Sequence, residues 1–185
     1  MYEIELKAEI TNSEAIKLTI DSLVNYVGDP IEKKDIYYKK PGESVPSFRI
    51  RKENDYILMT TKNNKRVDGI ETNEEIEFQV DMKYFDQTVR FAENLGYEIL
   101  IYKHKTGWQW IYDTIHVELL YVDTLGWYLE LEIVAKDLSQ KEEDVEKLYN
   151  FLRLCNIPKS CISNRSYQQM LQEQQVLKEE GNSCH

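Results

Sequence analysis

The sequence has no surplus of positive charge. Its 185 residues include 23 Lys and Arg against 33 Asp and Glu, so the formal net charge at pH 7 is −10. A general nucleic-acid binder needs an excess of exposed cations, because its binding displaces counterions from phosphates. The charge balance therefore argues against that class, and we expect no nucleic-acid partner.

Long apolar runs and a leader-like start are also absent from the sequence. No stretch approaches the ~18 apolar residues of a membrane span, and no basic segment followed by an apolar run opens the chain. Cysteine is scarce: Cys155, Cys161 and Cys184 are odd in number and lack metal-ligand spacing, which fits reduced thiols better than a disulfide framework. We expect a soluble cytoplasmic protein with no membrane partner.

What the sequence does contain is a set of like-charged residues spaced by two. Most of them alternate with apolar residues, as in a strand with one polar and one apolar face. Like charges held close on a sheet repel, so a face that only meets water needs no such repeated pairing. We infer that a ligand binds between the pairs. The pairs are Glu3 and Glu5, Arg49 and Arg51, Glu75 and Glu77, Lys103 and Lys105, and Glu130 and Glu132.

The two kinds of pair indicate the chemistry of that ligand. Carboxylate pairs suit hard divalent cations, which take oxygen ligands. Arg and Lys pairs suit phosphate oxygens. A polyphosphate bound together with its metal ion would satisfy both sets.

Hydrophobic periodicity predicts more strands than helices. The first helix is expected to open at Asn12 or Ser13, and Ser139 with Glu142 predicts a capping box before the third. A turn is expected at 63–65. The length suits one domain, which we assign to residues 1–180, followed by a polar tail at 181–185. The strands are expected near 2–10, 31–39, 47–53, 55–62, 73–80, 97–105, 107–113, 115–122 and 127–136, and the helices near 12–27, 82–95, 140–154 and 164–180.

These elements predict an α+β fold built on a closed antiparallel barrel of eight strands. The apolar strand faces need a cover, which the few amphipathic helices can supply from outside, and the charged faces then point inward. A barrel of about eight strands has an interior wide enough for one small ligand. A charged interior is tolerable only if opposite charges and ligand compensate one another. The lumen is therefore the expected site.

Several short motifs follow one another in an informative order. They are Glu-Ile-Glu-Leu-Lys at 3–7, Asp-Ile-Tyr-Tyr at 35–38, Phe-Arg-Ile-Arg at 48–51, Met-Thr-Thr-Lys at 59–62, Leu-Gly-Trp-Tyr-Leu-Glu-Leu-Glu at 125–132 and Arg-Ser-Tyr at 165–167. This ordered set spans nearly the whole chain and resembles the CYTH family, or triphosphate tunnel metalloenzymes, named for class IV adenylyl cyclase and thiamine triphosphatase. The overall pattern looks closest to the cyclase-like branch.

The resemblance implies a role for each charged pair. It implies that Mg²⁺ or Mn²⁺ is held by four carboxylates: Glu3, Glu5, Glu130 and Glu132. It implies that a triphosphate meets Lys7, Arg49, Arg51, Lys62, Lys103, Lys105 and Arg165, with Glu75 and Glu77 as the internal acidic pair. Of these, Lys7, Arg51 and Lys105 are expected to act in catalysis. Apart from the resemblance, the aromatic residues Tyr37 and Trp108 are candidates to touch a base or a thiazole ring.

Three positions depart from the family pattern. Asn73 stands where an Arg usually precedes the internal acidic pair, and Lys105 replaces an Arg, which keeps the charge but loses the bidentate fork. Leu120 stands where an Asp is usual, and Glu118 or Asp123 are candidates to compensate. The number of metal ions is therefore open.

Three functions follow from the resemblance. The leading one is a class IV-type adenylyl cyclase that converts ATP to 3′,5′-cyclic AMP and pyrophosphate. The first alternative is hydrolysis of tripolyphosphate, thiamine triphosphate or a nucleoside triphosphate in the same tunnel, and the second is a triphosphate-binding module without turnover. A homodimer is a possible assembly. Replacing Arg51 with Ala is expected to weaken triphosphate binding while leaving the fold intact.

Overall fold

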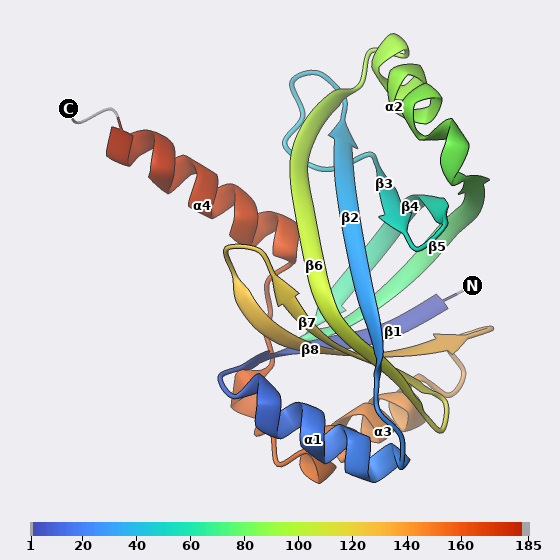
Figure 1. The fold of residues 1–185 in the computed structure, drawn as a ribbon, viewed down its shortest axis with the longest axis vertical. Coiled ribbons are helices and arrows are strands. Elements are labelled where there is room, and N and C mark those ends of the chain that lie inside the picture. The colour runs from blue at the N-terminus through green and yellow to red at the C-terminus, as the bar shows by residue number, and fades with distance from the viewer. Residues whose placement is uncertain (1, 183–185) are drawn as a thin grey trace.

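The computed structural model describes residues 2–182 and shows eight strands closed into a barrel (Figure 1). The strands are β1 Tyr2–Ile10, β2 Asp29–Lys39, β3 Phe48–Glu53, β4 Tyr56–Val67, β5 Ile70–Asp81, β6 Glu98–Tyr112, β7 Ile115–Val122 and β8 Gly126–Ala135. Their order around the barrel is β1-β5-β4-β3-β2-β6-β7-β8, and every neighbouring pair is antiparallel. The predicted fold class is therefore confirmed.

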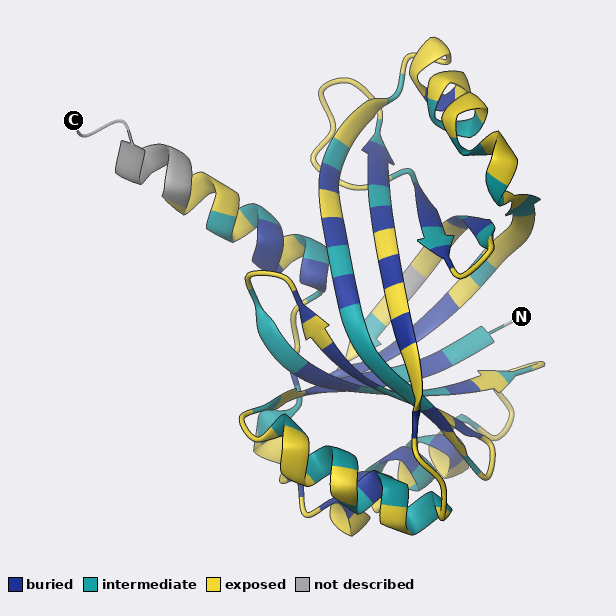
Figure 2. Cartoon of the chain, in the orientation of Figure 1, coloured by how far each residue is buried: buried dark blue, intermediate teal, exposed yellow. Residues whose placement is uncertain are grey.

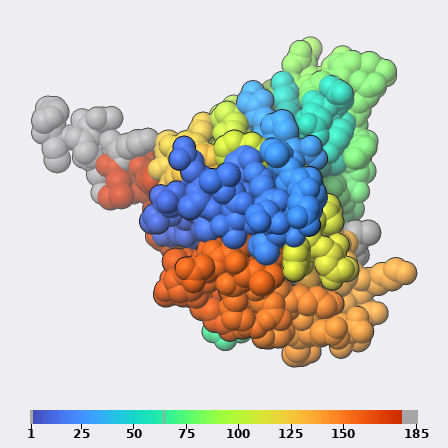
Figure 3. All heavy atoms as spheres, turned by 60° about the horizontal axis from the view of Figure 1, so that its bottom comes forward, coloured from blue at the N-terminus to red at the C-terminus, as the bar shows by residue number. Residues whose placement is uncertain are grey.

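Four α-helices lie outside the barrel. They are α1 Ser13–Val24, α2 Phe85–Asn94, α3 Lys141–Leu154 and α4 Tyr167–Asn182, and short 3₁₀ turns occupy Met82–Tyr84 and Lys159–Cys161. Helices α1 and α3 lie together at one end of the molecule, α2 lies at the other, and α4 projects sideways from the barrel (Figure 1). Seen from the α1 and α3 end, α1 and the segment around α3 form one continuous surface (Figure 3). None of the helices in residues 2–182 is long and apolar enough to cross a membrane.

The main apolar core lies between the outer barrel face and helices α1 and α3. Ile4, Leu129 and Leu131 point outward from β1 and β8 into this core, and Leu148 and Phe151 of α3 cover them; each of the five is fully buried. Because side chains alternate along a strand, this packing turns the intervening charged residues into the lumen. The banding of buried and exposed positions along the strands is visible in Figure 2.

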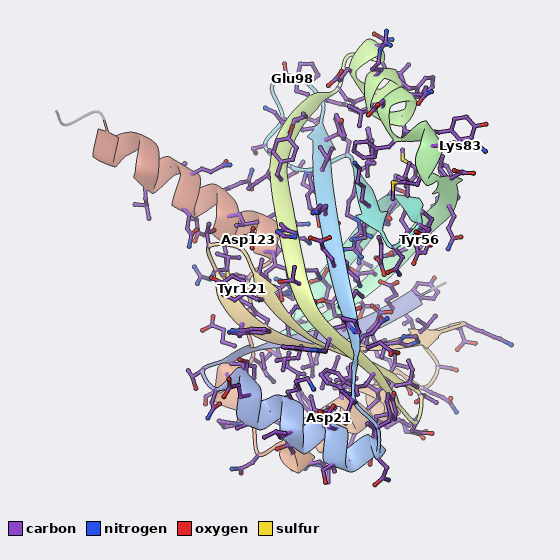
Figure 4. The ribbon with its side chains drawn as sticks, viewed as in Figure 1. Asp21, Tyr56, Lys83, Glu98, Tyr121 and Asp123 are labelled. Atoms are coloured by element: carbon purple, nitrogen blue, oxygen red, sulfur yellow. The ribbon has the colours of Figure 1, made fainter. Side chains whose placement is uncertain are left out.

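A polar contact also fixes α1 against the barrel. The Asp21 carboxylate of α1 accepts hydrogen bonds from Trp110 Nε1 of β6 at 2.9 Å and from the Gly28 backbone N–H at 3.0 Å (Figure 4). Hydrogen bonds to a charged group are stronger than neutral ones. This carboxylate therefore anchors both the helix and the start of β2.

Two predicted breaks between elements are wrong. β6 runs unbroken from 98 to 112, because Gly107 lets β7 approach where a Cβ would collide with the Leu119 carbonyl. The turn expected at 63–65 lies inside β4. The real turn is at Asp68 and Gly69, whose φ angles of 50° and 79° suit the two-residue hairpins that favour Asp-Gly.

The helix ends were predicted with mixed success. Asn12 does cap α1, because its side chain accepts a hydrogen bond from the Ala15 N–H at 3.1 Å. The capping box at Ser139 is wrong, since its hydroxyl donates to the Asp137 carboxylate instead. α4 extends to Asn182, so the first two residues of the expected 181–185 tail are helical, and the rest, with Cys184, lie outside the described residues.

Candidate active site

The barrel encloses a cavity of about 590 Å³. Ligand pockets span roughly 300–1,000 Å³, so this one has room for a small molecule. All but one of the site residues predicted from the sequence line it: Glu3, Glu5, Lys7, Tyr37, Arg49, Arg51, Lys62, Glu75, Glu77, Lys103, Lys105, Glu130 and Glu132. The exception is Arg165, which is exposed and pairs with Glu173 at 2.9 Å.

The barrel wall has a part rich in carboxylates on β1 and β8, the carboxylate wall. There Glu5 lies opposite Glu132 in the strand register, and Lys7 lies opposite Glu130. The arginine pair lies on β3 and the paired lysines on β6, with only β2 between these two strands, and these cations form the cationic wall. In the closed strand order β3 lies three strands from β1 and four from β8, so the arginine pair faces the carboxylates across the lumen, whereas Lys105 of β6, two strands from β8, contacts Glu130 directly.

Asp35 organises the cationic wall. Its carboxylate is buried and accepts hydrogen bonds from Arg51 Nε at 2.6 Å and Nη2 at 3.1 Å, and Lys103 Nζ lies 3.0 Å away. Although burial alone would raise the pKa of Asp35, the charges of Arg51 and Lys103 hold it well below its usual range. This ion group fixes one arginine and one lysine side by side.

Lys103 is a cation of the site with a strongly lowered pKa. Its Nζ donates a hydrogen bond to the Tyr37 hydroxyl at 2.7 Å, and the side chain is 6% exposed. Burial, together with the neighbouring charges of Lys105 and Arg51, lowers the pKa of Lys103 to about 7 despite the contact with Asp35. The cationic wall is thus close to the limit of positive charge that it can hold without an anion.

Arg49 and Lys62 extend the cationic wall over β3 and β4. Arg49 donates to Thr60 Oγ1 at 3.0 Å and contacts Glu77 at 3.5 Å. Lys62 forms ion pairs with Glu75 and, at 3.2 Å, with Glu3. Each of these cations therefore has an acidic partner that a phosphate group would have to replace.

Two carboxylates of β8 also have perturbed pKa values. Burial, with the nearby charges of Glu3 and Glu5, raises the pKa of Glu132 to about 8. Burial would raise the pKa of Glu130 too, but Lys105 Nζ at 2.9 Å holds it below its usual range. At neutral pH the Glu132 carboxyl is therefore mostly protonated, because the cations nearby do not offset burial and the charges of Glu3 and Glu5.

The donor set of the carboxylate wall fits a hard divalent cation. Carboxylate oxygens are the ligands that Mg²⁺ and Mn²⁺ prefer, and a cation among Glu3, Glu5 and Glu132 would relieve their mutual repulsion. In residues 2–182, no three His, Cys, Asp or Glu side chains already converge on one point. Metal binding would therefore require Glu3 and Glu5 to rotate away from Lys62 and Lys7.

Lys33 and Glu53 are lumen residues that the sequence analysis missed. Lys33 Nζ lies 2.5 Å from Glu118 and 3.9 Å from Glu53, and all three line the cavity. Lys33 precedes Asp35 by two residues and Glu53 follows Arg51 by two, so the spacing rule could have found them. Of the two candidates to compensate for Leu120, Glu118 faces the lumen, where it lies opposite Glu130 in the β7 and β8 register.

Of the departures noted in the sequence, Leu120 and Asn73 are both fully buried. The Asn73 side chain lies beside Glu3 in the register of β1 and β5, and neither its oxygen nor its nitrogen has a hydrogen-bond partner among the described residues. The other candidate for compensation, Asp123, is exposed at the end of β7, where it contacts His104 at 2.9 Å (Figure 4). It does not line the lumen cavity.

Helix α4 contributes a further lumen residue. Tyr167, its first residue, is buried and lines the cavity, and Gln172 one turn and a half later donates to the Ser44 carbonyl at 3.2 Å. Burial and the Glu130 charge raise the pKa of Tyr167 well above its usual range. The sequence placed this tyrosine in the Arg-Ser-Tyr motif without a role.

Comparisons with known proteins agree with this geometry. The family model of the CYTH domain matches residues 1–167. A protein of Methanocaldococcus jannaschii named "Putative adenylate cyclase" is 28% identical over 175 residues, which cover 90% of this chain and 97% of that protein.

Solved structures share the fold. A Vibrio parahaemolyticus protein, also named "putative adenylate cyclase", superposes with a TM-score of 0.78 at 18% identity and covers 93% of this chain and 98% of its own. A Hippeastrum protein, described as a "putative adenylyl cyclase" that reveals a dominant triphosphatase activity, has a TM-score of 0.65 at 17% identity, with 92% and 95% covered. Because the sequence identities of these structures are so low, the similarity shows a shared fold only.

Proposed function

Because the chain belongs to the CYTH family, we propose that its lumen binds a triphosphate with a divalent metal and that the protein converts ATP to 3′,5′-cyclic AMP and pyrophosphate. The observation that carries this proposal is that six clustered cations and four clustered carboxylates line one cavity of about 590 Å³. A polyanion with its cation complements both sets at once. The M. jannaschii relative, by its name, supports the choice of cyclisation.

The cations would hold the phosphate chain. Arg49 and Arg51 offer planar forks that suit phosphate oxygens, whereas Lys62, Lys103 and Lys105 act as point charges. Phosphate oxygens would replace the carboxylates that these side chains now contact, such as Asp35 beside Arg51 and Glu130 beside Lys105. The ion pairs thus keep the cations in place and charged until substrate arrives.

The metal site would lie on the carboxylate wall, with Glu3, Glu5, Glu130 and Glu132 as ligands. Bound there, Mg²⁺ or Mn²⁺ would supply charge neutralisation at the phosphate oxygens. We assign Lys7, Arg51 and Lys105 to the reaction itself, because charges fixed in a site of low exposure stabilise a developing anion more than water does. Lys7 and Lys105 are each less than 5% exposed.

Cyclisation requires one bond to form and one to break. The ribose 3′-oxygen bonds to the α-phosphorus, the bond from that phosphorus to the bridging oxygen breaks, and pyrophosphate leaves with the electron pair. The hydroxyl proton is lost to solvent. The work of the protein is to hold these atoms in line and to stabilise the charge on the leaving group.

Hydrolysis of a triphosphate is the second candidate. All the lumen cations identified here are suited to phosphate, and hydrolysis needs no contact to a sugar or base. The Hippeastrum structure, which shares this fold, is described with a dominant triphosphatase activity. Binding without turnover is a third candidate, favoured by the apolar Leu120 and the neutral Asn73 at positions where the family carries charge.

The reaction products separate these candidates. The purified protein is incubated with Mg²⁺ or Mn²⁺ and, separately, with ATP, thiamine triphosphate and tripolyphosphate, and the products are resolved by chromatography. We expect cyclic AMP and pyrophosphate from ATP. Orthophosphate would replace this proposal by the triphosphatase, and thermal stabilisation by tripolyphosphate without product would replace it by the binding module. No stabilisation and no product would reject the triphosphate site.

A further inference from the structure

Tyr167 of α4 lies against three lysines that belong to two different strands. The distances from its ring centroid to Nζ are 5.1 Å for Lys7 of β1, 5.3 Å for Lys103 and 5.5 Å for Lys105 of β6. Ammonium groups within about 6 Å of an aromatic ring are attracted by its negative face. One side chain from outside the barrel wall therefore contacts half of the six lumen cations assigned to the triphosphate.

The lysines gain from this contact because they repel one another. Three ammonium groups that share one ring carry like charges at close range, and each long side chain is free to turn away unless something holds it. The ring attracts the ammonium groups through its electron-rich face but has no net negative charge. A phosphate group can therefore bind the same lysines without displacing the ring. Carboxylate partners, in contrast, must be displaced when a polyanion binds.

The tyrosine hydroxyl also lies at the site. It is buried and makes no hydrogen bond of full geometry within residues 2–182, but it lies close to Glu130: burial and this contact raise the pKa of the hydroxyl, and the contact helps to lower the pKa of Glu130. A buried hydroxyl costs free energy unless it is fully partnered, so packing of α4 alone would be served as well by a phenylalanine. A small movement would complete the hydrogen bond from the hydroxyl to the Glu130 carboxylate.

We propose that Tyr167 is a positioning residue through which α4 completes the triphosphate site: its ring holds Lys7, Lys103 and Lys105 on one side of the lumen, and its hydroxyl orients the Glu130 carboxylate for the metal ion. This inference rests on the proposed function. It assigns part of the site to a helix outside the barrel, so docking of α4 sets the affinity of the lumen for phosphate. Preorganised side chains lower the ordering cost of binding.

Two substitutions at Tyr167 separate the ring from the hydroxyl. Tyr167→Leu removes both, and we expect the dissociation constant of tripolyphosphate, measured by calorimetry on the full chain, to rise about tenfold. Tyr167→Phe keeps the ring, and we expect tripolyphosphate affinity within about twofold of the wild type. The Mn²⁺ affinity of Tyr167→Phe, measured by electron paramagnetic resonance without any turnover, should fall roughly tenfold, as for loss of a hydrogen bond that orients a metal ligand.

Two control variants exclude a general loss of packing. Met170→Ala loosens α4 at a buried residue of the cluster that also holds Val122, Tyr128 and Tyr167. Because it keeps the Tyr167 ring, it should weaken tripolyphosphate binding less than Tyr167→Leu does. Tyr38→Phe removes another buried hydroxyl without a partner, in the apolar cluster under α2 and away from the lumen cavity, and it should leave Mn²⁺ affinity unchanged. Thermal unfolding without ligand reports whether each variant is folded.

The outcomes distinguish this inference from the function on which it rests. If the wild-type chain binds tripolyphosphate but Tyr167→Leu binds it equally well, or if Met170→Ala weakens binding as much as Tyr167→Leu does, the ring has no positioning role. Unchanged Mn²⁺ affinity in Tyr167→Phe would remove the role of the hydroxyl. Failure of the wild-type chain itself to bind any triphosphate would reject the proposed function instead.

Discussion

Two buried regions of this protein share the same strands and follow opposite rules. On the outer face of β8, Leu129 and Leu131 are 0% exposed and pack against apolar side chains of α3. On the inner side of the barrel, Lys105 and Asp35 are 3% and 2% exposed and are surrounded by charges. The two sets of side chains are buried to a similar extent. Only burial of the apolar set lowers the free energy of the folded state, because charged groups are costly to desolvate even when they are paired.

The comparison indicates that stability comes from the outer face and function from the inner one. A barrel filled with apolar side chains would be more stable, since buried ion pairs often can be replaced by apolar groups at no cost. The retained charges therefore point to ligand binding. Substitutions on the two faces of a strand should then separate activity from stability.

The largest expected effect comes from Glu130→Gln on the inner face. Removal of one negative charge from the carboxylate wall should lower metal-dependent turnover on the order of 10³-fold, as for loss of a preorganised charge at other sites, with a change of only a few degrees in Tm. Initial rates across a Mg²⁺ titration measure this. Glu74→Gln, at an exposed position of β5, is the matched control, and full activity in Glu130→Gln would sink the metal-site assignment.

Arg51→Ala should lower both stability and binding. The substitution leaves the Asp35 carboxylate buried with Lys103 as its one remaining close cation, and breaking a buried pair costs roughly 3–5 kcal/mol. The expectation from the sequence, weaker binding with an intact fold, stays a prediction, and the buried Asp35 adds a loss of stability to it. Urea unfolding gives the free energy of unfolding, and calorimetry with tripolyphosphate gives the affinity.

The double variant Asp35→Asn with Arg51→Ala tests the reason for that loss. Because no buried carboxylate then lacks its partner, most of the unfolding free energy should return, while tripolyphosphate affinity stays low. A double variant as unstable as Arg51→Ala would show that packing of the arginine, and not the unpaired charge, was responsible.

Leu148→Ala tests the outer face. This residue of α3 is 0% exposed in the main core, and Leu→Ala substitutions at such positions cost about 2–5 kcal/mol. Turnover per folded molecule should equal that of the wild type at a temperature where the variant remains folded. An equal loss of turnover and stability would mean that the two faces of the barrel are not independent.

The separation of the faces could be predicted from the sequence, and the pairing across the lumen could not. The alternation of Glu130 with Leu129 and Leu131 fixes which side of β8 each residue takes, because the side-chain period of a strand is two. The contact of Lys33 with Glu118 joins residues 85 positions apart, and it depends on β2 and β7 both flanking β6. Nothing local encodes that order. The same holds for Tyr167, whose three lysine neighbours lie 160, 64 and 62 residues earlier in the chain.

Local signals also failed where contacts outside the pattern compete with them. Ser139 and Glu142 have the spacing of a capping box, but the Ser139 hydroxyl is taken by Asp137 only two residues away. The expected strands broke at 106, yet the missing side chain of Gly107 allows one strand, β6, to continue past Leu119. In both places a neighbour that the pattern does not include decides the outcome.

The smallest expected effect is the uptake of a fraction of a proton when the inner face binds its ligand. The pKa of Lys103 is lowered to about 7 by burial and by its cationic neighbours, so at pH 8 this amine is mostly neutral. Contact with phosphate favours the charged form, and tripolyphosphate binding should therefore take up less than one proton at Lys103. Calorimetry in two buffers of different ionisation enthalpy measures the uptake.

The same shift sets the sign of a pH effect on stability. The folded-state pKa of Lys103 lies below the unfolded value of 10.5, so between about pH 7 and 10.5 the unfolded chain binds more protons and the contribution of Lys103 to the free energy of unfolding rises with pH. Lys103→Met should abolish both this rise and the proton uptake. Lys52 lies on the outer side of β3, over the Phe85 ring of α2. Lys52→Met should therefore keep the rise of stability with pH and the proton uptake, because the ammonium that it removes lies outside the lumen. Proton uptake that persists in Lys103→Met would mean that another lumen group, and not Lys103, changes its charge when phosphate binds.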